Sequence, residues 1–272
     1  MKKNKECKKC YGKGIVVSYN SNYAYAEICS CRKDCEKCGN SGVLYEKDSE
    51  GYIVVKVCEC EKYKIRASLF NRAKVPAKYY DKRIDWFNPV NDSVGEARKH
   101  ILNFAKKYPA VDKGILLQGN PGVGKTHLAV GLIADLTIEK GVECIFKDFL
   151  SLLTELKEAY SRGGYSDVEI LNTLTNAEIL VIDELGKGRN TEWELAIIDQ
   201  LISKRYNSKK TTIFTTNFFI KDDIKADTLQ KTWGPKALVS LEERLDERIM
   251  SRLTEMCHFI KIDGEDYRIK ET

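Results

Sequence analysis

Two kinds of hydrophobic pattern divide the chain. Near the start, residues 15–28 and 43–57 are each rich in Val, Ile and Tyr on either side of a polar turn. Segments of this kind predict β-hairpins. From about residue 91 onward, short apolar runs alternate with longer segments in which apolar residues recur every three or four positions. Such alternation is typical of buried parallel strands joined by amphipathic helices. The pattern therefore predicts a small β-hairpin module followed by an α/β domain.

The α/β domain contains five apolar runs that read as buried strands. They lie at residues 114–118, 142–149, 178–185, 211–219 and 257–262. Continuous apolar strands between helices favour a parallel sheet covered on both faces. We therefore expect a three-layer α/β/α fold with a parallel five-stranded sheet. Cys144 and Cys257 fall inside these strands, where we expect inert core thiols.

Helices are signalled by caps and by apolar stripes. Ser93-x-x-Glu96 and Thr191-x-x-Glu194 have the spacing of capping boxes. The segment FLSLLTELKEAYSRGG has apolar residues at 149, 152, 153, 156 and 160 and ends in two glycines, so it predicts one helix. Near the end of the chain, a second stripe predicts a single helix. Its members are Leu238, Leu241, Leu245, Ile249 and Leu253.

Composition bounds the class of protein. The 272 residues are enough for one α/β core and a small extra module. The basic first residues have no apolar segment behind them, and no apolar run is long enough to span a bilayer. We therefore expect a cytoplasmic protein without a membrane segment.

Positive charge is concentrated in one short stretch. The net charge is +5, and residues 61–85 carry eight Lys or Arg against three acids, with Tyr and Phe interleaved. Such a stretch can meet phosphates or an acidic partner, or it can be a solvated linker helix. The sequence leaves both interpretations open.

Eight of the ten cysteines form an internal repeat. CKKCYGKG aligns with CEKCGNSG at a shift of 28 residues, and the later C-x-C pairs align at a shift of 29. Each copy thus contains a C-x-x-C pair, a predicted hairpin and a C-x-C pair. The hairpin returns the second pair to the first, so each copy gathers four thiols. The two sets are Cys7, Cys10, Cys29 and Cys31, and then Cys35, Cys38, Cys58 and Cys60.

Four thiols are the number that a tetrahedral structural zinc requires. A reducing compartment disfavours disulfides, so we expect two structural Zn²⁺ ions. An interleaved set of ligands remains possible because Cys31 and Cys35 are close in sequence. The C-x-x-C-x-G-x-G units resemble the zinc-rich module of DnaJ-type chaperones, although the second pairs differ and an HPD motif is absent. This resemblance implies a module that contacts other proteins.

A phosphate-binding loop follows the first strand of the α/β domain. Residues 119–126 read GNPGVGKT, the P-loop pattern, between a buried strand and a buried helix. Backbone N–H groups of such a loop cradle phosphates, while Lys125 reaches the terminal phosphates and Thr126 binds Mg²⁺. We therefore predict an ATP and Mg²⁺ site. The residues assigned to it are Gly119, Asn120, Pro121, Gly122, Val123, Gly124, Lys125, Thr126 and the adjoining His127.

Polar residues end the next strands. Asp183 and Glu184 follow the apolar run ILVI, which is the Walker B arrangement. We expect Asp183 in the Mg²⁺ shell and Glu184 as the general base toward water. Asn217 ends a neighbouring strand, where ligands gather in open α/β sheets, so it can orient that water.

Three arginines are spaced four residues apart near the end of the chain. Arg244, Arg248 and Arg252 would share one helical face. The residues alone leave two interpretations open. One is a surface helix with Arg244–Glu247 and Arg252–Glu255 pairs. The other is an arginine finger that reaches the nucleotide of a neighbouring subunit.

Several motifs together resemble the AAA+ branch formed by the helicase loaders DnaC and DnaI and the transposition helper IstB. They are GNPGVGKTHLA, FLSLLTELKEAY, ILVIDELG, TTN and ERLDERIMSRL followed by GEDYR, and they cover about residues 68–270. The resemblance implies a catalytic arginine finger at Arg248 or Arg252, with Arg252 favoured, acting between subunits. It also implies that Arg268 contacts nucleotide. The helix after the second strand would contribute to binding single-stranded DNA. Candidates there are Lys147, Lys157, Tyr160 and Arg162.

We therefore expect three parts: a tandem zinc module over residues 1–61, a basic linker over 62–90 and an AAA+ ATPase domain over 91–272. The family resemblance implies loading of a replicative DnaB-type helicase, with the zinc module docking the helicase. One alternative is an IstB-like helper of a DNA transposase. Another is a zinc-dependent polypeptide-binding adaptor with a regulatory ATPase.

Overall fold

The computed structural model describes residues 7–32, 34–163, 166–220 and 239–267. The chain forms two compact units. One comprises the residues up to Asp81 together with Ile133–Glu143, and the other comprises Lys82–Leu132 and the residues from Cys144 onward. Among the described residues, no helix combines the length and the apolar character needed to cross a bilayer.

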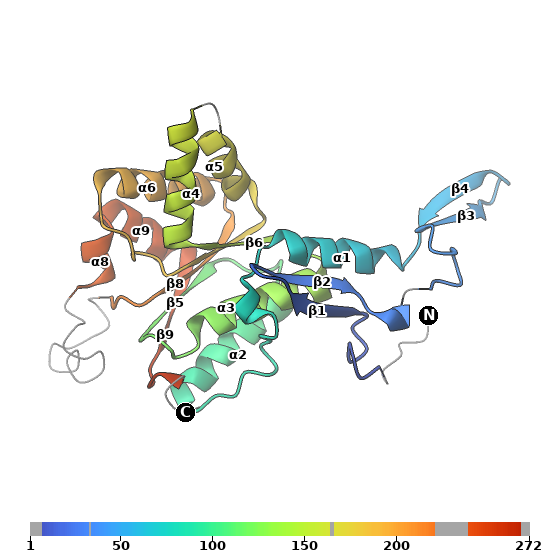
Figure 1. Ribbon diagram of the computed structural model, residues 1–272, viewed down its shortest axis with the longest axis horizontal. Coiled ribbons are helices and arrows are strands. Elements are labelled where there is room, and N and C mark those ends of the chain that lie inside the picture. The colour runs from blue at the N-terminus through green and yellow to red at the C-terminus, as the bar shows by residue number, and fades with distance from the viewer. Residues whose placement is uncertain (1–6, 33, 164–165, 221–238, 268–272) are drawn as a thin grey trace. The chain divides into compact units, whose positions relative to one another are not determined.

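The N-terminal unit contains the two predicted hairpins (Figure 1). The first pairs β1 (Ile15–Tyr19) with β2 (Ala24–Ile28), and the second pairs β3 (Val43–Lys47) with β4 (Ile53–Val57). Both are antiparallel, and their registers match under the sequence repeat: Val17 pairs with Ala26, and Tyr45 pairs with Val55. A 3₁₀ turn, η1 (Ser30–Arg32), follows the first hairpin.

A helix follows the second hairpin and belongs to the same unit. It is α1 (Glu61–Arg72), which lies alongside β2 (Figure 1) and buries Phe70 completely. After it come η2 (Ala77–Tyr79) and the end of the unit at Asp81. Most of the stretch expected to be a basic linker is therefore ordered structure in this unit, because α1 has an apolar side that packs rather than being solvated all round.

The second unit is built on a five-stranded sheet in the order β6-β7-β8-β5-β9, with every neighbouring pair parallel. This confirms the predicted α/β class and strand number. The strands are β5 (Gly114–Gly119), β6 (Cys144–Asp148), β7 (Ile179–Asp183), β8 (Thr211–Thr216) and β9 (Cys257–Ile262). Cys144 and Cys257 are buried as expected.

Helices cover both faces of this sheet (Figure 1). One face carries α2 (Asp92–Lys107) and α3 (Lys125–Ala134), which continues into a π-helical turn, η3 (Asp135–Lys140). The other face carries α4 (Phe149–Arg162), α5 (Ser166–Asn176), α6 (Glu192–Asn207), α8 (Leu241–Arg244) and α9 (Glu247–Met256). A continuous apolar core joins this second group to Leu116, Leu180 and Phe214 of the strands.

Two helix predictions need correction. The single helix expected over residues 238–253 is wrong, because Leu245 is extended and Asp246 caps a new helix by accepting from the N–H of Ile249 at 2.7 Å. Leu238 lies outside the described residues. The cap of α2 is Asn91 rather than Ser93, and the Thr191 capping box of α6 is confirmed.

Candidate nucleotide site and cysteine clusters

The phosphate loop leaves β5 and enters α3 at the carboxyl edge of the sheet. Its backbone turns through left-handed conformations at Gly122 (φ 82°) and Gly124 (φ 100°), which favour glycine. A Cβ on Gly124 would lie 2.6 Å from the Phe87 ring, so the loop has no room for a side chain there. In glycine loops of this kind the backbone N–H groups bind phosphate oxygens. Val123, by contrast, is buried inside the loop.

The side chains at the start of α3 are held in place by the loop and by the neighbouring strands. Lys125 is buried, and its Nζ donates to the carbonyl oxygens of Gly119 and Asn120 at 2.7 Å each. The Thr126 hydroxyl donates to Asp183 Oδ1 at 2.8 Å. The two residues predicted to surround Mg²⁺ therefore lie together, although the P-loop strand and the Walker B strand are not adjacent in the sheet.

A second hydroxyl completes this network. Thr215 of β8 donates to Asp183 Oδ1 at 2.5 Å and accepts from the backbone N–H of Glu184 at 3.0 Å. Burial raises the pKa of Asp183 above its usual range, although the Thr215 and Thr126 hydroxyls oppose this by stabilising the carboxylate. A divalent cation would favour the same charged form, so the donor set of Thr126 and Asp183 fits Mg²⁺. Thr215 was missed in the sequence, where it reads only as a β-branched strand residue.

Glu184 stands at the first position after β7 with a left-handed backbone (φ 60°). Its carboxylate accepts from Lys187 Nζ at 2.5 Å, and this contact raises the pKa of Lys187. Asn217 follows β8 directly and is half-buried. The end of β7 is thus the place where Glu184, Lys187 and Thr215 meet.

The segment before α2 also contributes to this region. The His127 ring lies 4.8 Å from the Phe87 ring in an edge-on arrangement, and His127 Nε2 is 3.2 Å from the carbonyl oxygen of Arg83. Ile84 is fully buried beside Gly131 of α3. The sequence placed residues 82–90 in a linker. The apolar residues of this stretch are an isoleucine and a Trp-Phe pair among charged residues. They have neither helical nor strand periodicity, so the sequence did not predict that the stretch packs against α3.

Residues after β9 lie across the phosphate loop. A Cβ on Gly122 would be 1.9 Å from Asp266 Oδ1, and the Tyr267 backbone N–H donates to the Gly122 carbonyl at 3.2 Å. Most of the GEDYR motif therefore meets the loop. Arg268, predicted to contact nucleotide, lies outside the described residues.

The three arginines do not share one helix. Arg244 is on α8 and donates to the carbonyl oxygens of Gly186 and Gly188. On α9, Arg252 is 25% exposed and its Nη1 lies 2.6 Å from Asp199 Oδ1, whereas Arg248 is 70% exposed and 3.9 Å from the same carboxylate. Among the ion pairs of the described residues, neither the Arg244–Glu247 nor the Arg252–Glu255 pair of the surface-helix interpretation forms. The break at Leu245 gives Arg244 a structural role and leaves Arg248 as the more accessible of the two finger candidates.

The cysteines gather in two tetrads within the N-terminal unit, one for each repeat. One contains Cys7, Cys10, Cys29 and Cys31, and the other contains Cys35, Cys38, Cys58 and Cys60. In each tetrad all four sulfurs lie within 4.8 Å of one another. This is the tandem grouping, in which each hairpin brings its own two pairs together.

The tetrads fit a metal rather than disulfides. The Cys7–Cys29 and Cys35–Cys58 sulfurs are 3.7 Å apart, far beyond a bond of about 2.05 Å. A tetrahedron with Zn–S distances of about 2.3 Å has sulfurs about 3.8 Å apart. Backbone N–H groups of Cys10 and Lys9 lower the pKa of Cys7 to about 6, which favours the thiolate that metals bind.

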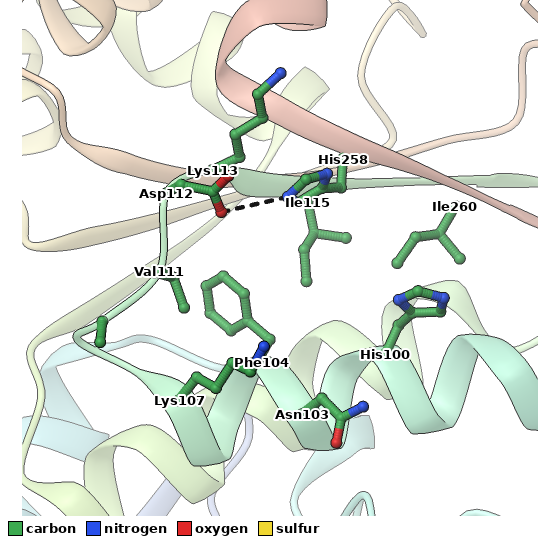
Figure 2. A pocket seen from close by; sticks show the side chains of 11 residues that line it. His100, Asn103, Phe104, Lys107, Val111, Asp112, Lys113, Ile115, His258 and Ile260 are labelled. Carbon is green, nitrogen blue, oxygen red and sulfur yellow. Dashed lines mark hydrogen bonds and ion pairs between the residues drawn. The ribbon is translucent and has the colours of Figure 1, made fainter.

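A separate cavity of about 330 Å³ lies between α2, the loop before β5, and β9 (Figure 2). Phe104, Ile115 and Ile260 form apolar walls, and His258 Nε2 is 3.4 Å from Asp112 Oδ1. The cavity is at the amino ends of β5 and β9, away from the phosphate loop. None of the predicted site residues lines it.

Comparison with known proteins gives a consistent family. The model of the family "IstB-like ATP binding protein" matches residues 71–272. The replicative helicase loader DnaC of Escherichia coli (strain K12) is 30% identical over 126 residues, which are 45% of this chain and 51% of that protein. The phage-like element PBSX protein XkdC of Bacillus subtilis (strain 168) is 23% identical over 257 residues, which are 90% of this chain and 88% of that protein.

Solved structures agree with this result. The crystal structure of the DnaC helicase loader has 32% sequence identity and a TM-score of 0.57, covering 68% of this chain and 98% of that one. The crystal structure of DnaI, at 21% identity and a TM-score of 0.54 over 71% of this chain and 93% of that one, supports the fold alone.

The chain spans about half the length of the DnaC proteins that it matches. The family model nevertheless covers most of the chain, including every element of the five-stranded sheet and the phosphate loop. The protein therefore belongs to the IstB-like ATP binding protein family and has the AAA+ fold of the DnaC helicase loader.

Proposed function

We propose that this protein uses ATP hydrolysis to load a replicative DnaB-type helicase onto single-stranded DNA. The observation that carries the proposal is the Thr126–Asp183–Thr215 network beside the phosphate loop. It sits in a domain that is 32% identical to the DnaC helicase loader structure and spans 98% of it. The network supports binding and hydrolysis of ATP. The likeness to DnaC supports helicase loading as the process that this hydrolysis serves.

The nucleotide site divides its tasks among a few side chains. Thr126 and Asp183 would hold Mg²⁺, which neutralises phosphate charge when it is bound. Lys125 would leave the loop carbonyls and reach the terminal phosphates. Glu184 would accept a proton from the attacking water, and Asn217 would orient that water. Phe87 and His127 stand beside the loop, where we expect them to contact the nucleotide.

The Glu184–Lys187 pair bears on the rate of hydrolysis. Lys187 Nζ donates to a Glu184 carboxylate oxygen at 2.5 Å, so that oxygen must be released before it can accept a proton from water. We expect slow turnover by the isolated chain, and faster turnover when assembly draws Lys187 away. Assembly would also bring the arginine finger, Arg248 or Arg252, from one subunit to the phosphates of the next, so the protein would self-associate.

The DNA-binding role is proposed for α4. Lys157 and Tyr160 are exposed on this helix, and a phenol ring can stack on a base while an ammonium group meets a phosphate. Tyr160 does not belong to the buried stripe of α4, in which Ala159 takes the place that the sequence pattern gave it. Lys147 forms an ion pair with Glu155, so it contributes less free charge.

The docking role is proposed for the N-terminal unit. Each cysteine tetrad would hold one structural Zn²⁺, because hairpins this small bury too little apolar surface to fold unaided. The metals would fix two hairpins on which a helicase can dock. This assignment rests on the grouping of the thiols and on the likeness to helicase loaders.

A second candidate function is an ATPase helper of a DNA transposase. It is supported by the description of the matched family model, "IstB-like ATP binding protein". The nucleotide site would be the same in both cases. The partner differs: a helper would bind a transposase, and a loader would bind a ring helicase.

The test uses the full chain with the purified replicative helicase of the same organism. Wild type should bind ATP, bind the helicase and hydrolyse ATP slowly. Lys125→Ala should lose ATP binding, and Glu184→Gln should bind ATP but turn over about 10²–10⁴-fold more slowly. If Lys125→Ala still binds ATP with wild-type affinity, the proposed nucleotide site is wrong. If wild type does not bind the helicase, the proposed loader function is wrong.

A further inference from the structure

The two hairpins of the N-terminal unit can be compared position by position. Under the sequence repeat, Ala24, Ala26 and Ile28 of β2 correspond to Ile53, Val55 and Val57 of β4. The turns that hold the first two thiols are also the same, since Tyr11 N–H donates to the Cys7 carbonyl and Gly39 N–H to the Cys35 carbonyl, both at 2.8 Å. The two hairpins therefore have the same backbone structure, and their residues can be compared one to one.

The outer edge of β2 is covered at Ala24 and Ala26. Asn71 of α1 accepts from the Ala26 N–H at 2.6 Å and donates to the Ala26 carbonyl at 3.0 Å. Beyond α1, the Val75 carbonyl accepts from the Ala24 N–H at 2.8 Å, and Ala77 N–H donates to Asn22. A helix and the extended segment behind it thus pair with this edge as an additional strand would.

The corresponding edge of β4 has no such cover. The Cys58–Gly42 and Asp48–Tyr52 bonds fix which backbone groups face β3, so the N–H and C=O groups of Ile53 and Val55 point outward. Within residues 34–163 and the other described segments, no group bonds to these outward positions of β4. We call this row the open edge.

The side chains next to the open edge are apolar. One face of the second hairpin carries Val43, Tyr45, Lys47, Ile53, Val55 and Val57, and we call it the open face. Tyr45 and Val57 are each 72% exposed and Val55 is 62% exposed, whereas Ala26, the counterpart of Val55, is 3% exposed. Natural sheets usually protect such edges with charge, proline or a covering element. Here the first hairpin has a covering element along its edge strand, and the second hairpin has none among the described residues.

We propose that the open edge and open face of the second hairpin bind an extended segment of the partner protein, which pairs with β4 as residues 75–77 pair with β2. The proposal rests on the proposed function, in which that partner is the replicative helicase. Main-chain bonds to Ile53 and Val55 would supply affinity, and apolar side chains over Tyr45 and Val57 would supply specificity. Strand addition of this kind buries an edge that is otherwise exposed.

Charge indicates one further property of the segment. Lys47 is the single charged residue of the open face, and its counterpart in the first hairpin is Tyr19, whose ring lies 4.6 Å from that of Tyr80 in the covering chain. The bound segment should therefore place a carboxylate where the first hairpin's cover places Tyr80. An apolar segment with one acidic residue near the hairpin turn is the occupant that fits.

The test measures affinity of the full chain for the purified helicase. Val55→Pro removes the outward N–H without touching a bond to β3, since proline is tolerated on edge strands with that orientation. Val55→Thr is the matched control, because it keeps the N–H and the β-branched shape. We expect Val55→Pro to weaken binding at least tenfold and Val55→Thr by less than threefold. Zinc content and ATP turnover of both variants, each measured without helicase, should equal wild type.

A charge reversal completes the design. Lys47→Glu should weaken binding, and an acid-to-lysine change in the helicase segment should restore it. Val55→Pro that binds as tightly as wild type, with wild type binding well, would overturn the open-edge proposal and leave the loader function standing. Wild type that fails to bind helicase would overturn the loader function instead. Loss of self-association in Val55→Pro with helicase binding intact would show that a second copy, and not a partner, occupies the edge.

Discussion

The two hairpins of the N-terminal unit share their arrangement of cysteine pairs, register and turn geometry, yet they differ in what covers them. The first has small residues, Ala24 and Ala26, where α1 and the following segment lie against β2. The second has Ile53 and Val55 at the same positions, and they face solvent. The two copies of the repeat have the same fold and differ in the residues that decide what packs against them.

The difference separates structural from binding roles within one small module. Alanines allow a helix to approach closely, so the first hairpin is part of the unit's own core. Large β-branched residues on an exposed strand gain nothing in the isolated chain, and they add affinity only when a partner buries them. The comparison therefore predicts different responses of the two hairpins to matched changes.

Loss of a metal site should have the largest effect. Structural zinc contributes about 10–16 kcal/mol to small metal-dependent folds, so Cys10→Ser and Cys38→Ser should each remove one Zn²⁺ and unfold its hairpin. Cys10→Ser should also loosen α1, because α1 lies along the first hairpin. Zinc stoichiometry and amide hydrogen exchange of α1 measure both effects. If amide hydrogen exchange of α1 rises equally in the two variants, the proposed difference between the covered first hairpin and the open second hairpin is wrong.

A reciprocal swap of one position should have the next largest effect. Ala26→Val adds two methyl groups beside α1 and should destabilise the unit by about 1–3 kcal/mol. Val55→Ala, on the open face, should change stability by no more than about 0.5 kcal/mol. Chemical denaturation followed by a probe in the N-terminal unit measures both. A larger loss in Val55→Ala than in Ala26→Val would mean that the second hairpin is the better packed of the two.

Removal of the Asn71 side chain, which bonds to the edge of β2, should have a somewhat smaller effect on stability. Asn71→Ala removes both hydrogen bonds to Ala26 and leaves its N–H and carbonyl without a partner, a change of about 1–2 kcal/mol. Hydrogen exchange at the Ala26 amide should rise, while exchange at Val55 should stay as it is in wild type. Unchanged protection at Ala26 would show that the side-chain cap is not what covers that edge.

A surface ion pair on the second hairpin should matter least. Lys56 Nζ lies 2.6 Å from Glu46 Oε2, but both side chains are exposed. Exposed pairs are worth about 0–1 kcal/mol, so Lys56→Ala should leave thermal unfolding and helicase affinity close to wild type. A tenfold loss of helicase affinity in this variant would move the binding surface to the opposite face of the hairpin.

Elements with strong periodicity were predictable from the sequence. The five strands, both hairpins and the cysteine grouping follow from patterns that span many residues. The break between α8 and α9 was not predicted, since the apolar stripe continues through it; the competing signals were the Ser240-x-x-Glu243 box and Asp246. The local capping residues therefore decided where the helices end and begin, although the apolar stripe continues across the break.

The nucleotide region shows where sequence reasoning ends. Lys125, Thr126 and Asp183 are signalled by spacing, and the structure brings them together. Phe87 and Thr215 reach the same region through tertiary contacts that no local pattern carries. Helix α5 was missed because it follows two glycines that the pattern read as the end of the helical segment.

Helicase loading is the most direct test of the account. Purified replicative helicase would be mixed with this protein and ATP on circular single-stranded DNA coated with single-strand-binding protein, and DNA-bound helicase would be counted. We expect loading by wild type and none by Lys125→Ala. Equal loading by the two proteins, or no loading by wild type with a transposase recruited instead, would contradict the proposed function.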